Sequence, residues 1–256
     1  MGRLDGRVAI VTGAAHGNRA AIGSHYATAL AREGAKVSVA DLKDCRSVAA
    51  EIEKAGGTAE PLAVDVRDEA SVNAMVAKTV ERFGRLDILV NNAAMGSNIP
   101  PIPIGEMSVG EWDALMAVNV RGPFLCSKAA VAVMKKQRYG KIVNVGSTTM
   151  MTGLPNRLHY VTAKGAILAM TRAMASELGA DGIRVNTISY GLITNAVTEA
   201  EFQAHPEKRK AIIGERAMAK DLYADDLLGT LVYLCSADSD AVTGQCLVID
   251  NGAVYN

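Results

Sequence analysis

Three residues near the middle of the chain have the types and spacing of a proton-transfer site. Ser147 is followed by Tyr160, and Lys164 comes four residues after the tyrosine. If the chain is helical there, the last two side chains leave one face of one turn. A nearby ammonium lowers the pKa of a phenol, and a serine hydroxyl can hold a substrate oxygen. The three residues predict acid–base chemistry at such an oxygen, although a lone Tyr-x-x-x-Lys also occurs on ordinary helix surfaces.

The chain around these residues alternates between apolar runs of strand length and helical patterns. Strands are expected over 8–11, 36–40, 59–64, 88–90, 141–145, 184–188 and 246–249. Helices are expected over 22–32, 45–54, 71–83, 111–136, 160–178 and 224–234. This alternation is typical of an α/β fold whose parallel sheet is covered on both faces, and right-handed crossovers make it doubly wound. We therefore expect a seven-stranded parallel sheet with helices on both faces.

Two segments interrupt the alternation. Residues 96–103 are a proline-rich stretch after the fourth strand, and residues 194–213 are a mostly polar insertion after the sixth. Both follow the carboxyl ends of strands, where open α/β sheets bind ligands. Either segment alone could also be an ordinary surface loop.

The first strand runs into a glycine turn that suits a dinucleotide. Gly13 and Gly17 stand in this turn, and a helix opens near Ile22. Glycines there let the backbone approach a pyrophosphate, although any tight turn needs glycine. Asp41 ends the second strand, where a carboxylate accepts both ribose hydroxyls of NAD and repels the 2′-phosphate of NADP; it could also be a plain helix N-cap. Arg19 in the turn could instead pair with that phosphate.

Further motifs stand in order along the chain. They are Thr12-Gly13-x-x-x-Gly17, Asp65-Val66, Asn91-Asn92-Ala93-Ala94, Asn119, Ser147, Tyr160-x-x-x-Lys164 and Thr243-Gly244-Gln245. Together they resemble the short-chain dehydrogenase/reductase family in its single-domain form, over nearly the whole chain. The resemblance implies one Rossmann-fold domain over 1–256, with a cofactor part over about 1–145 and a catalytic and substrate part over about 146–256.

The resemblance also implies an NAD(H)-dependent oxidoreductase that interconverts a secondary alcohol and a ketone. Tyr160 would be the acid or base, Ser147 would orient the oxygen, Lys164 would also bind the nicotinamide ribose, and Asn119 would hold a water that joins Lys164 to solvent. The implied cofactor contacts are Gly13, Gly17, Ile22, Asp41, Asp65, Val66, Asn91, Ala93, Tyr160, Lys164, Gly191, Ile193 and Thr194. Asn91 could instead be only a turn former, and Asn119 only a helix irregularity.

The chain departs from the family pattern in three places. Residues 18–21 lengthen the glycine turn to that of the divergent enoyl-acyl-carrier-protein reductases, but the spacing of Tyr160 and Lys164 argues against enoyl reduction. Tyr190 replaces the usual proline after the sixth strand, and Asn195 replaces a threonine that normally contacts the nicotinamide. Thr194 or Asn195 could still make that hydrogen bond.

A substrate pocket is expected above Tyr160. Its candidate lining is Met95, Asn98, Ser147, Thr149, Met150, Met151, Leu154, Tyr190 and Leu192. Because most of these are apolar, and methionine adapts to irregular shapes, the pocket favours a small or medium organic carbonyl over a bare sugar. The methionines could also simply fill the core, and His159 is interpreted as a packing residue.

The composition limits the remaining possibilities. Lys and Arg number 27, as do Asp and Glu, so neither a nucleic-acid groove nor a membrane surface is expected. The four cysteines lack metal-ligand spacing, and no apolar run is long enough to span a bilayer; we expect a cytoplasmic enzyme without a metal. The resemblance implies a homotetramer through helices 111–136 and 160–178. Rival interpretations are an NADP-dependent carbonyl reductase, a nucleotide-sensing protein without activity, and a dehalogenase of the same fold.

Overall fold

The computed structural model describes residues 2–17, 22–96 and 99–255, and these residues form a seven-stranded parallel sheet. The strands are β1 Val8–Thr12, β2 Lys36–Asp41, β3 Thr58–Ala63, β4 Ile88–Asn91, β5 Gly140–Val145, β6 Ile183–Tyr190 and β7 Cys246–Ile249. They lie in the order β3-β2-β1-β4-β5-β6-β7. The predicted doubly wound α/β fold is confirmed, and the order reverses between β1 and β4, where such sheets bind ligands.

The central strands are buried on both faces because their sequences are almost continuously apolar. Every residue of β1, β4 and β5 is buried, as expected for a parallel sheet covered by helices on both sides. Two separate hydrophobic cores result. One packs Tyr26, Leu30 and Leu231 against one face of the sheet, and the other packs Met75 and Met134 against the opposite face.

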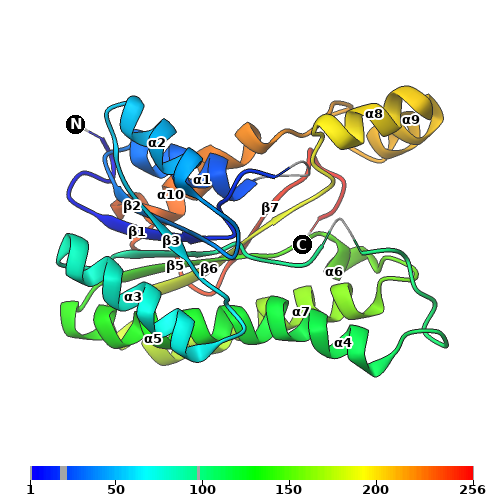
Figure 1. Ribbon diagram of the computed structural model, residues 1–256. Coiled ribbons are helices and arrows are strands. Elements are labelled where there is room, and N and C mark those ends of the chain that lie inside the picture. The colour runs from blue at the N-terminus through cyan, green and yellow to red at the C-terminus, as the bar shows by residue number, and fades with distance from the viewer. Residues whose placement is uncertain (1, 18–21, 97–98, 256) are drawn as a thin grey trace.

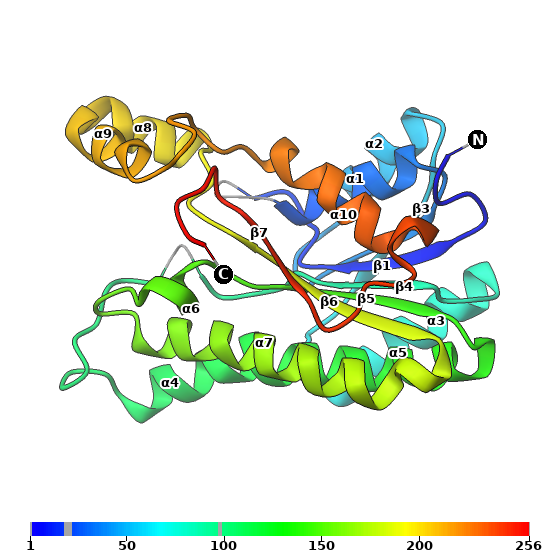
Figure 2. The same cartoon turned by 180° about the vertical axis from the view of Figure 1, so that it is seen from behind.

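Helices form one layer on each side of the sheet (Figure 1, Figure 2). The first layer contains α1 Ile22–Arg32, α2 Arg46–Lys54 and α10 Leu228–Cys235, with the short helix η3 Ala224–Leu227 leading into α10. The second contains α3 Glu69–Phe83, α4 Val109–Met116, α5 Gly122–Gln137 and α7 Leu158–Leu178. Two short helices, η2 Gly179–Asp181 and η4 Ala237–Ser239, precede β6 and β7. None of the helices in the described ranges is long and apolar enough to cross a membrane.

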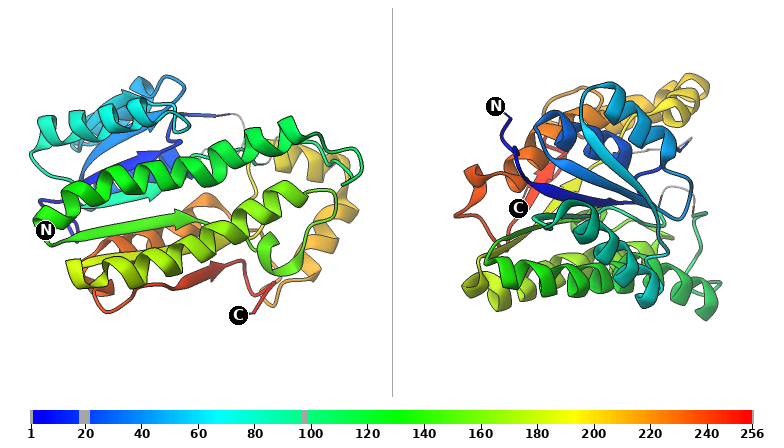
Figure 3. Two further views of the ribbon diagram at one scale, coloured as in Figure 1. Left: turned by 90° about the horizontal axis from the view of Figure 1, so that it is seen from below. Right: turned by 60° about the vertical axis from the view of Figure 1, so that its left-hand side comes forward.

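The long helix predicted over 111–136 is present but interrupted. It consists of α4, the π-helical segment η1 Ala117–Arg121 and α5, and it lies beside α7 (Figure 3). Ser108 caps the start of this helix. Its hydroxyl accepts a hydrogen bond from the backbone N–H of Glu111, and the Glu111 carboxylate accepts one from the backbone N–H of Ser108. A π-bulge of this kind often marks a functional position, and here it contains the buried Asn119.

Three helices stand beyond the carboxyl ends of the strands. They are α6 Thr149–Thr152 after β5, and α8 Ala196–Ala204 and α9 Pro206–Gly214 after β6. The insertion predicted after the sixth strand is therefore a pair of helices that projects past the sheet (Figure 1). Asn195 caps α8 by accepting hydrogen bonds from the N–H groups of Val197 and Thr198.

Candidate active site

Ser147, Tyr160 and Lys164 come together at the carboxyl end of β5. Ser147 follows that strand directly, while Tyr160 and Lys164 stand one turn apart near the start of α7. The Nζ atom of Lys164 lies 5.7 Å from the centroid of the Tyr160 ring. The Oγ atom of Ser147 accepts a hydrogen bond of 3.0 Å from the Thr149 hydroxyl and one of 3.3 Å from its N–H, which fixes the serine at the start of α6.

Burial dominates the electrostatics of this cluster. Lys164 is only 4% exposed and donates a 2.8 Å hydrogen bond to the carbonyl of Val145. Desolvation lowers its pKa from 10.5 to about 8. Burial also raises the pKa of Tyr160, while a hydrogen bond with Ser147 and the charge of Arg157 lower it. The net lowering of the tyrosine pKa that the sequence predicted is therefore absent from the protein alone, because desolvation outweighs the hydrogen bond with Ser147 and the charge of Arg157.

Asn119 makes two hydrogen bonds to the loop that follows β4. Its Oδ1 atom accepts from the N–H of Met95, and its Nδ2 atom donates to the carbonyl of Met95, both at 2.7 Å. Asn119 sits in the helix irregularity η1, as one interpretation of the sequence expected, and it also hydrogen-bonds to the loop after β4. A water relay from Asn119 to Lys164 stays a prediction.

The same loop passes close to Tyr160. A Cβ atom built on Gly96 would lie 3.4 Å from the Cε2 atom of Tyr160 and 3.9 Å from its hydroxyl. Any larger side chain at this position would therefore compete with a substrate for the space beside the phenol. Gly96 was not singled out from the sequence as a site residue, and only its place in the proline-rich stretch pointed to it.

The glycine turn is held by tight contacts with the segment after β4. Gly13 has a φ of +66°, and a Cβ there would lie 2.6 Å from the Cα atom of Ala93. A Cβ on Gly23 would lie 2.1 Å from the carbonyl oxygen of Gly13. Asn92 donates to the carbonyls of Thr12 and Gly13 at 3.0 and 2.9 Å, and the Thr12 hydroxyl accepts from the N–H groups of Asn92 and Ala93.

Thr12, Asn92 and Gly23 were not predicted as site residues from the sequence. They lie inside or beside the motifs that resemble the family, and these motifs are the sequence signal that could have identified them. Gly17 and Ile22 border the turn on either side, and Arg19 lies outside the described residues. A pyrophosphate contact by the described part of the turn and by the start of α1 stays a prediction.

Asp41 faces this turn from the end of β2. One carboxylate oxygen accepts a 3.0 Å hydrogen bond from the N–H of Ala15, and the other accepts a 2.9 Å bond from the N–H of Lys43. The residue at the N-cap of α2 is Cys45, so the alternative of Asp41 as a helix cap was wrong. The carboxylate is half-buried and keeps lone pairs that can accept from ribose hydroxyls.

Asp65 and Val66, two further predicted cofactor residues, are held in place by contacts within the protein. Arg67 binds both oxygens of Asp65, at 2.9 and 2.7 Å, and these hydrogen bonds hold the pKa of that carboxyl below its usual range. Val66 is buried, and a Cβ on Gly122 would lie 2.9 Å from it. The cofactor contacts of these residues stay predictions.

Asn91 ends β4 and is not a turn former. Its Nδ2 atom donates to the hydroxyl of Ser127 at 3.0 Å and to the Oδ1 atom of Asn144 at 2.8 Å. Asn144 in turn donates to Thr171, whose hydroxyl bonds to Thr187. Asn91 is thus the end of a buried polar chain that links β4 and β5 to α5 and α7, which agrees with a supporting role in the sheet.

The predicted cofactor residues between β6 and α8 contact other parts of the protein. Gly191 packs against Asp250, where a Cβ would lie 3.2 Å from the Asp250 Cβ, and Ile193 is buried. The hydroxyl of Thr194 donates to Asp221 at 3.1 Å. Thr194 and the capping Asn195 therefore both have partners within the protein. A nicotinamide contact by either side chain stays a prediction.

Most of the predicted pocket residues are apolar, and their place around a substrate at Tyr160 stays a prediction. Met95, Leu154 and Leu192 are the more exposed, at 39 to 45%. The remaining described candidates, Thr149, Met150, Met151 and Tyr190, belong to α6 or to the end of β6; Asn98 lies outside the described residues. Burial, with a smaller effect of Tyr160, raises the pKa of Tyr190, so its phenol is neutral. His159 is almost completely buried and packs in the interior, as expected.

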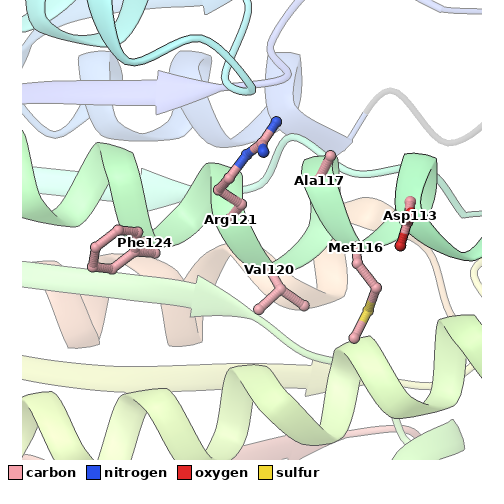
Figure 4. A pocket seen from close by; sticks show the side chains of 6 residues that line it. All are labelled: Asp113, Met116, Ala117, Val120, Arg121 and Phe124. Atoms are coloured by element: carbon pink, nitrogen blue, oxygen red, sulfur yellow. The ribbon is translucent and has the colours of Figure 1, made fainter.

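A separate shallow pocket lies on the helical face formed by α4, η1 and α5 (Figure 4). Its lining consists of Asp113, Met116, Ala117, Val120, Arg121 and Phe124. It contains none of the predicted catalytic or cofactor residues. Across residues 2–17, 22–96 and 99–255, no group of three or more His, Cys, Asp or Glu side chains is placed to hold a metal ion.

The fold and the site define a dinucleotide-dependent oxidoreductase of the Rossmann type. A family model described as enoyl-(acyl carrier protein) reductase matches residues 13–254. The 3-oxoacyl-(acyl-carrier-protein) reductase FabG of Thermotoga maritima is 34% identical over 98% of this chain and 99% of its own length. Cyclopentanol dehydrogenase of a Comamonas strain is 34% identical over 100% of both chains. A gluconate 5-dehydrogenase from Burkholderia cenocepacia, solved with NADP and tartrate, has a TM-score of 0.89 and 30% identity over 98% of this chain and 96% of that one.

The chain belongs to the short-chain dehydrogenase/reductase family of oxidoreductases, which bind a nicotinamide dinucleotide. The family model carries the name of enoyl reduction, whereas the relatives named above are a ketone reductase and alcohol dehydrogenases.

Proposed function

We propose that this chain is an NAD(H)-dependent oxidoreductase that interconverts a secondary alcohol and a ketone. The observation that carries the proposal is the cluster of Ser147, Tyr160 and Lys164 at the carboxyl end of β5, beside the glycine turn and Asp41. A nicotinamide dinucleotide, when bound, supplies or accepts the hydride. The protein therefore needs to supply only binding, orientation and proton transfer.

The side chains divide the proton transfer among them. In the direction of oxidation, the phenolate of Tyr160 takes the hydroxyl proton of the alcohol. Ser147 holds the same oxygen by a hydrogen bond, and Lys164 supplies a positive charge one helical turn away from the phenolate. In the direction of reduction, the neutral phenol of Tyr160 gives its proton to the ketone oxygen. The raised pKa of the phenol in the protein alone favours its neutral form.

NAD is the proposed cofactor because of Asp41. Its half-buried carboxylate ends β2 beside the glycine turn, where it can accept from both ribose hydroxyls and would repel a 2′-phosphate. The second candidate is an NADP-dependent carbonyl reductase. That candidate is favoured by the 30% identical gluconate 5-dehydrogenase, which was solved with NADP.

We infer the substrate class from the apolar residues that are predicted to line a pocket at Tyr160. Met95, Met150, Met151, Leu154 and Tyr190 support a small or medium organic alcohol or ketone. The named relatives are a 3-oxoacyl-(acyl-carrier-protein) reductase, a cyclopentanol dehydrogenase and a gluconate 5-dehydrogenase, so the class of reaction is shared while the size and polarity of the substrate differ among them.

We also propose a homotetramer in the cytoplasm. The four cysteines are free thiols, which suits a reducing compartment. The outer face of α4, η1 and α5 carries Met116, Val120 and a half-exposed Phe124 (Figure 4), and a second copy of this chain would cover these apolar side chains.

One experiment separates the proposed function from its rivals. Purified protein is titrated with NADH and NADPH, and its turnover is then measured with a panel of secondary alcohols and ketones. Tight NADH binding together with turnover supports the proposal. Binding without any turnover across the panel would instead favour a nucleotide-sensing protein, and turnover only with NADPH would favour the carbonyl reductase.

A further inference from the structure

Arg157 lies at the entrance to the catalytic cluster. It occupies the N-cap position of α7 and comes three residues before Tyr160. Residues three apart at the start of a helix have Cβ atoms roughly 5–6 Å apart, so the two side chains leave neighbouring positions. Arg157 is half-buried as a whole residue.

The guanidinium of Arg157 joins two loops beside the tyrosine. Its Nη1 atom donates to the carbonyl oxygen of Ile99. The N–H of Ile102 donates a 2.8 Å hydrogen bond to the carbonyl of Asn156, next to the arginine. Together with Gly96 against the Tyr160 ring, these contacts place Arg157 on the wall of the space above the phenol.

No acidic side chain balances this charge within the described ranges. The guanidinium of Arg157 forms no ion pair there, and the one hydrogen bond of the guanidinium to a described residue goes to the neutral carbonyl of Ile99. By contrast, Arg209 on α9 pairs with both Asp221 and Glu199. A partly desolvated charge without a counter-ion is unfavourable, and an arginine has five N–H donors, so most of its donors remain for a ligand.

The charge of Arg157 also acts on the reaction centre. It lowers the pKa of the Tyr160 phenol, against the larger effect of burial. A charge that the tyrosine senses is also within range of a substrate whose oxygen lies at the tyrosine. Because Met95 and Leu154 nearby are apolar, they cannot satisfy an anionic substituent, whereas a guanidinium can.

We propose that Arg157 binds an oxyanion of the substrate, so that the preferred substrates are hydroxy acids and keto acids rather than neutral alcohols and ketones. This proposal rests on the proposed function and deepens it by naming the substituent. The planar guanidinium matches a carboxylate with two parallel hydrogen bonds. A sulfonate or phosphate on the same carbon skeleton would offer the same kind of oxygens.

The main alternative is that Arg157 has only a structural role, in which its hydrogen bond to the carbonyl of Ile99 stabilises that loop. That role and the binding role predict different patterns of loss. A merely structural arginine supports the geometry of the site for every substrate, so its removal would slow charged and neutral substrates alike. An anion-binding arginine affects only the charged members of matched pairs.

The test uses pairs that differ only in charge. The probes are 3-hydroxybutanoate with its methyl ester and 4-hydroxypentanoate with its methyl ester, assayed for kcat/KM with NAD in the wild type, Arg157→Met and Arg157→Lys. Since a hydrogen-bonded ion pair of this kind contributes a factor of about 10–100, Arg157→Met should lose about that factor on the acids and change less than about 3-fold on the esters. Arg157→Lys should fall between. Arg32→Met, an exposed arginine on α1, serves as the control and should change neither.

A binding measurement makes the test independent of turnover. Calorimetry compares 4-oxopentanoate with its methyl ester on the complex with NAD⁺, which holds no hydride to reduce a ketone, in the wild type and in Arg157→Met. A wild type that binds and turns over the acids no better than the esters overturns the proposal, and so does an equal loss on both members in Arg157→Met. Turnover of neutral alcohols without acid preference would leave the proposed function intact, whereas no turnover of any probe alcohol or ketone would count against the function itself.

Discussion

Replacing Lys164 by methionine should stabilise the nucleotide-free protein at neutral pH while removing its activity. Lys164 is 4% exposed, and desolvation lowers its pKa from 10.5 to about 8. At about 1.4 kcal/mol per pKa unit, this lowering costs the folded state about 3 kcal/mol whenever the lysine is charged. Methionine has a similar volume and no charge. It loses the hydrogen bond to the carbonyl of Val145, which offsets about 1 kcal/mol.

The net gain should be about 2 kcal/mol at pH 7, or about 4–8 °C in Tm for a chain of this size. The folded-state pKa of Lys164 lies below the unfolded value, so the unfolded chain binds more protons between these two values. The stability of the wild type should therefore rise as the pH increases from about 8 toward 10.5. By pH 10 the penalty should be about 1 kcal/mol or less, and the advantage of Lys164→Met should have disappeared.

The assay is thermal unfolding of the wild type and Lys164→Met at pH 7, 8.5 and 10, at one protein concentration. Lys78→Met, which removes an exposed lysine from α3, is the matched control and should show no such pH-dependent gain. Catalytic activity with a secondary alcohol is measured in parallel and should be lost only in Lys164→Met. A variant that is less stable than the wild type at pH 7, or a difference that does not change between pH 7 and 10, would refute the desolvation argument.

Three further predictions concern the acid–base group, the cofactor and the assembly. Tyr160→Phe should abolish turnover and leave NADH affinity near that of the wild type, because the ring still packs but carries no proton; substantial residual turnover in the purified variant would remove the assignment. The wild type should have a higher kcat/KM with NAD than with NADP, and Asp41→Ala should narrow that preference by removing the carboxylate at the end of β2; equal or better efficiency of the wild type with NADP would contradict this. Light scattering should give the mass of a tetramer, and Phe124→Glu, which places a charge on the half-exposed face of α5, should shift it toward smaller species; a monomeric wild type would rule out the assembly.

The fold could be predicted from the sequence because each element depends on local patterns. The buried strands are short apolar runs, and the helices have the expected periodicity, so the seven-stranded parallel sheet was confirmed together with most element boundaries. The interruption at η1 was less visible. A π-turn adds one residue without changing which residue types face the core, and only the polar Asn119 within an apolar helix face suggested it.

The candidate site was predictable where it depends on spacing along one element and less so where it depends on contacts between loops. The separation of Tyr160 and Lys164 on one helical face follows from the periodicity of a helix. The pKa of Tyr160 does not, because it depends on how much protein surrounds the ring, and that burial exceeds the effect of the nearby charges. The role of Asp41 was left open between a cap and a ligand contact, and the observed cap at Cys45 decides against the first.

Arg157 is the clearest example of a residue whose proposed role in this site could not be predicted from the sequence. An arginine just before a helix is unremarkable in sequence, since its charge is normally solvated or paired. What distinguishes it is a relation among separate segments: the bond to Ile99, the approach of Gly96 to Tyr160, and the lack of an acidic partner in the described part of the chain. A counter-ion supplied by the substrate would complete this arrangement, and the guanidinium would then select the substrate as well as influence the phenol that acts on it.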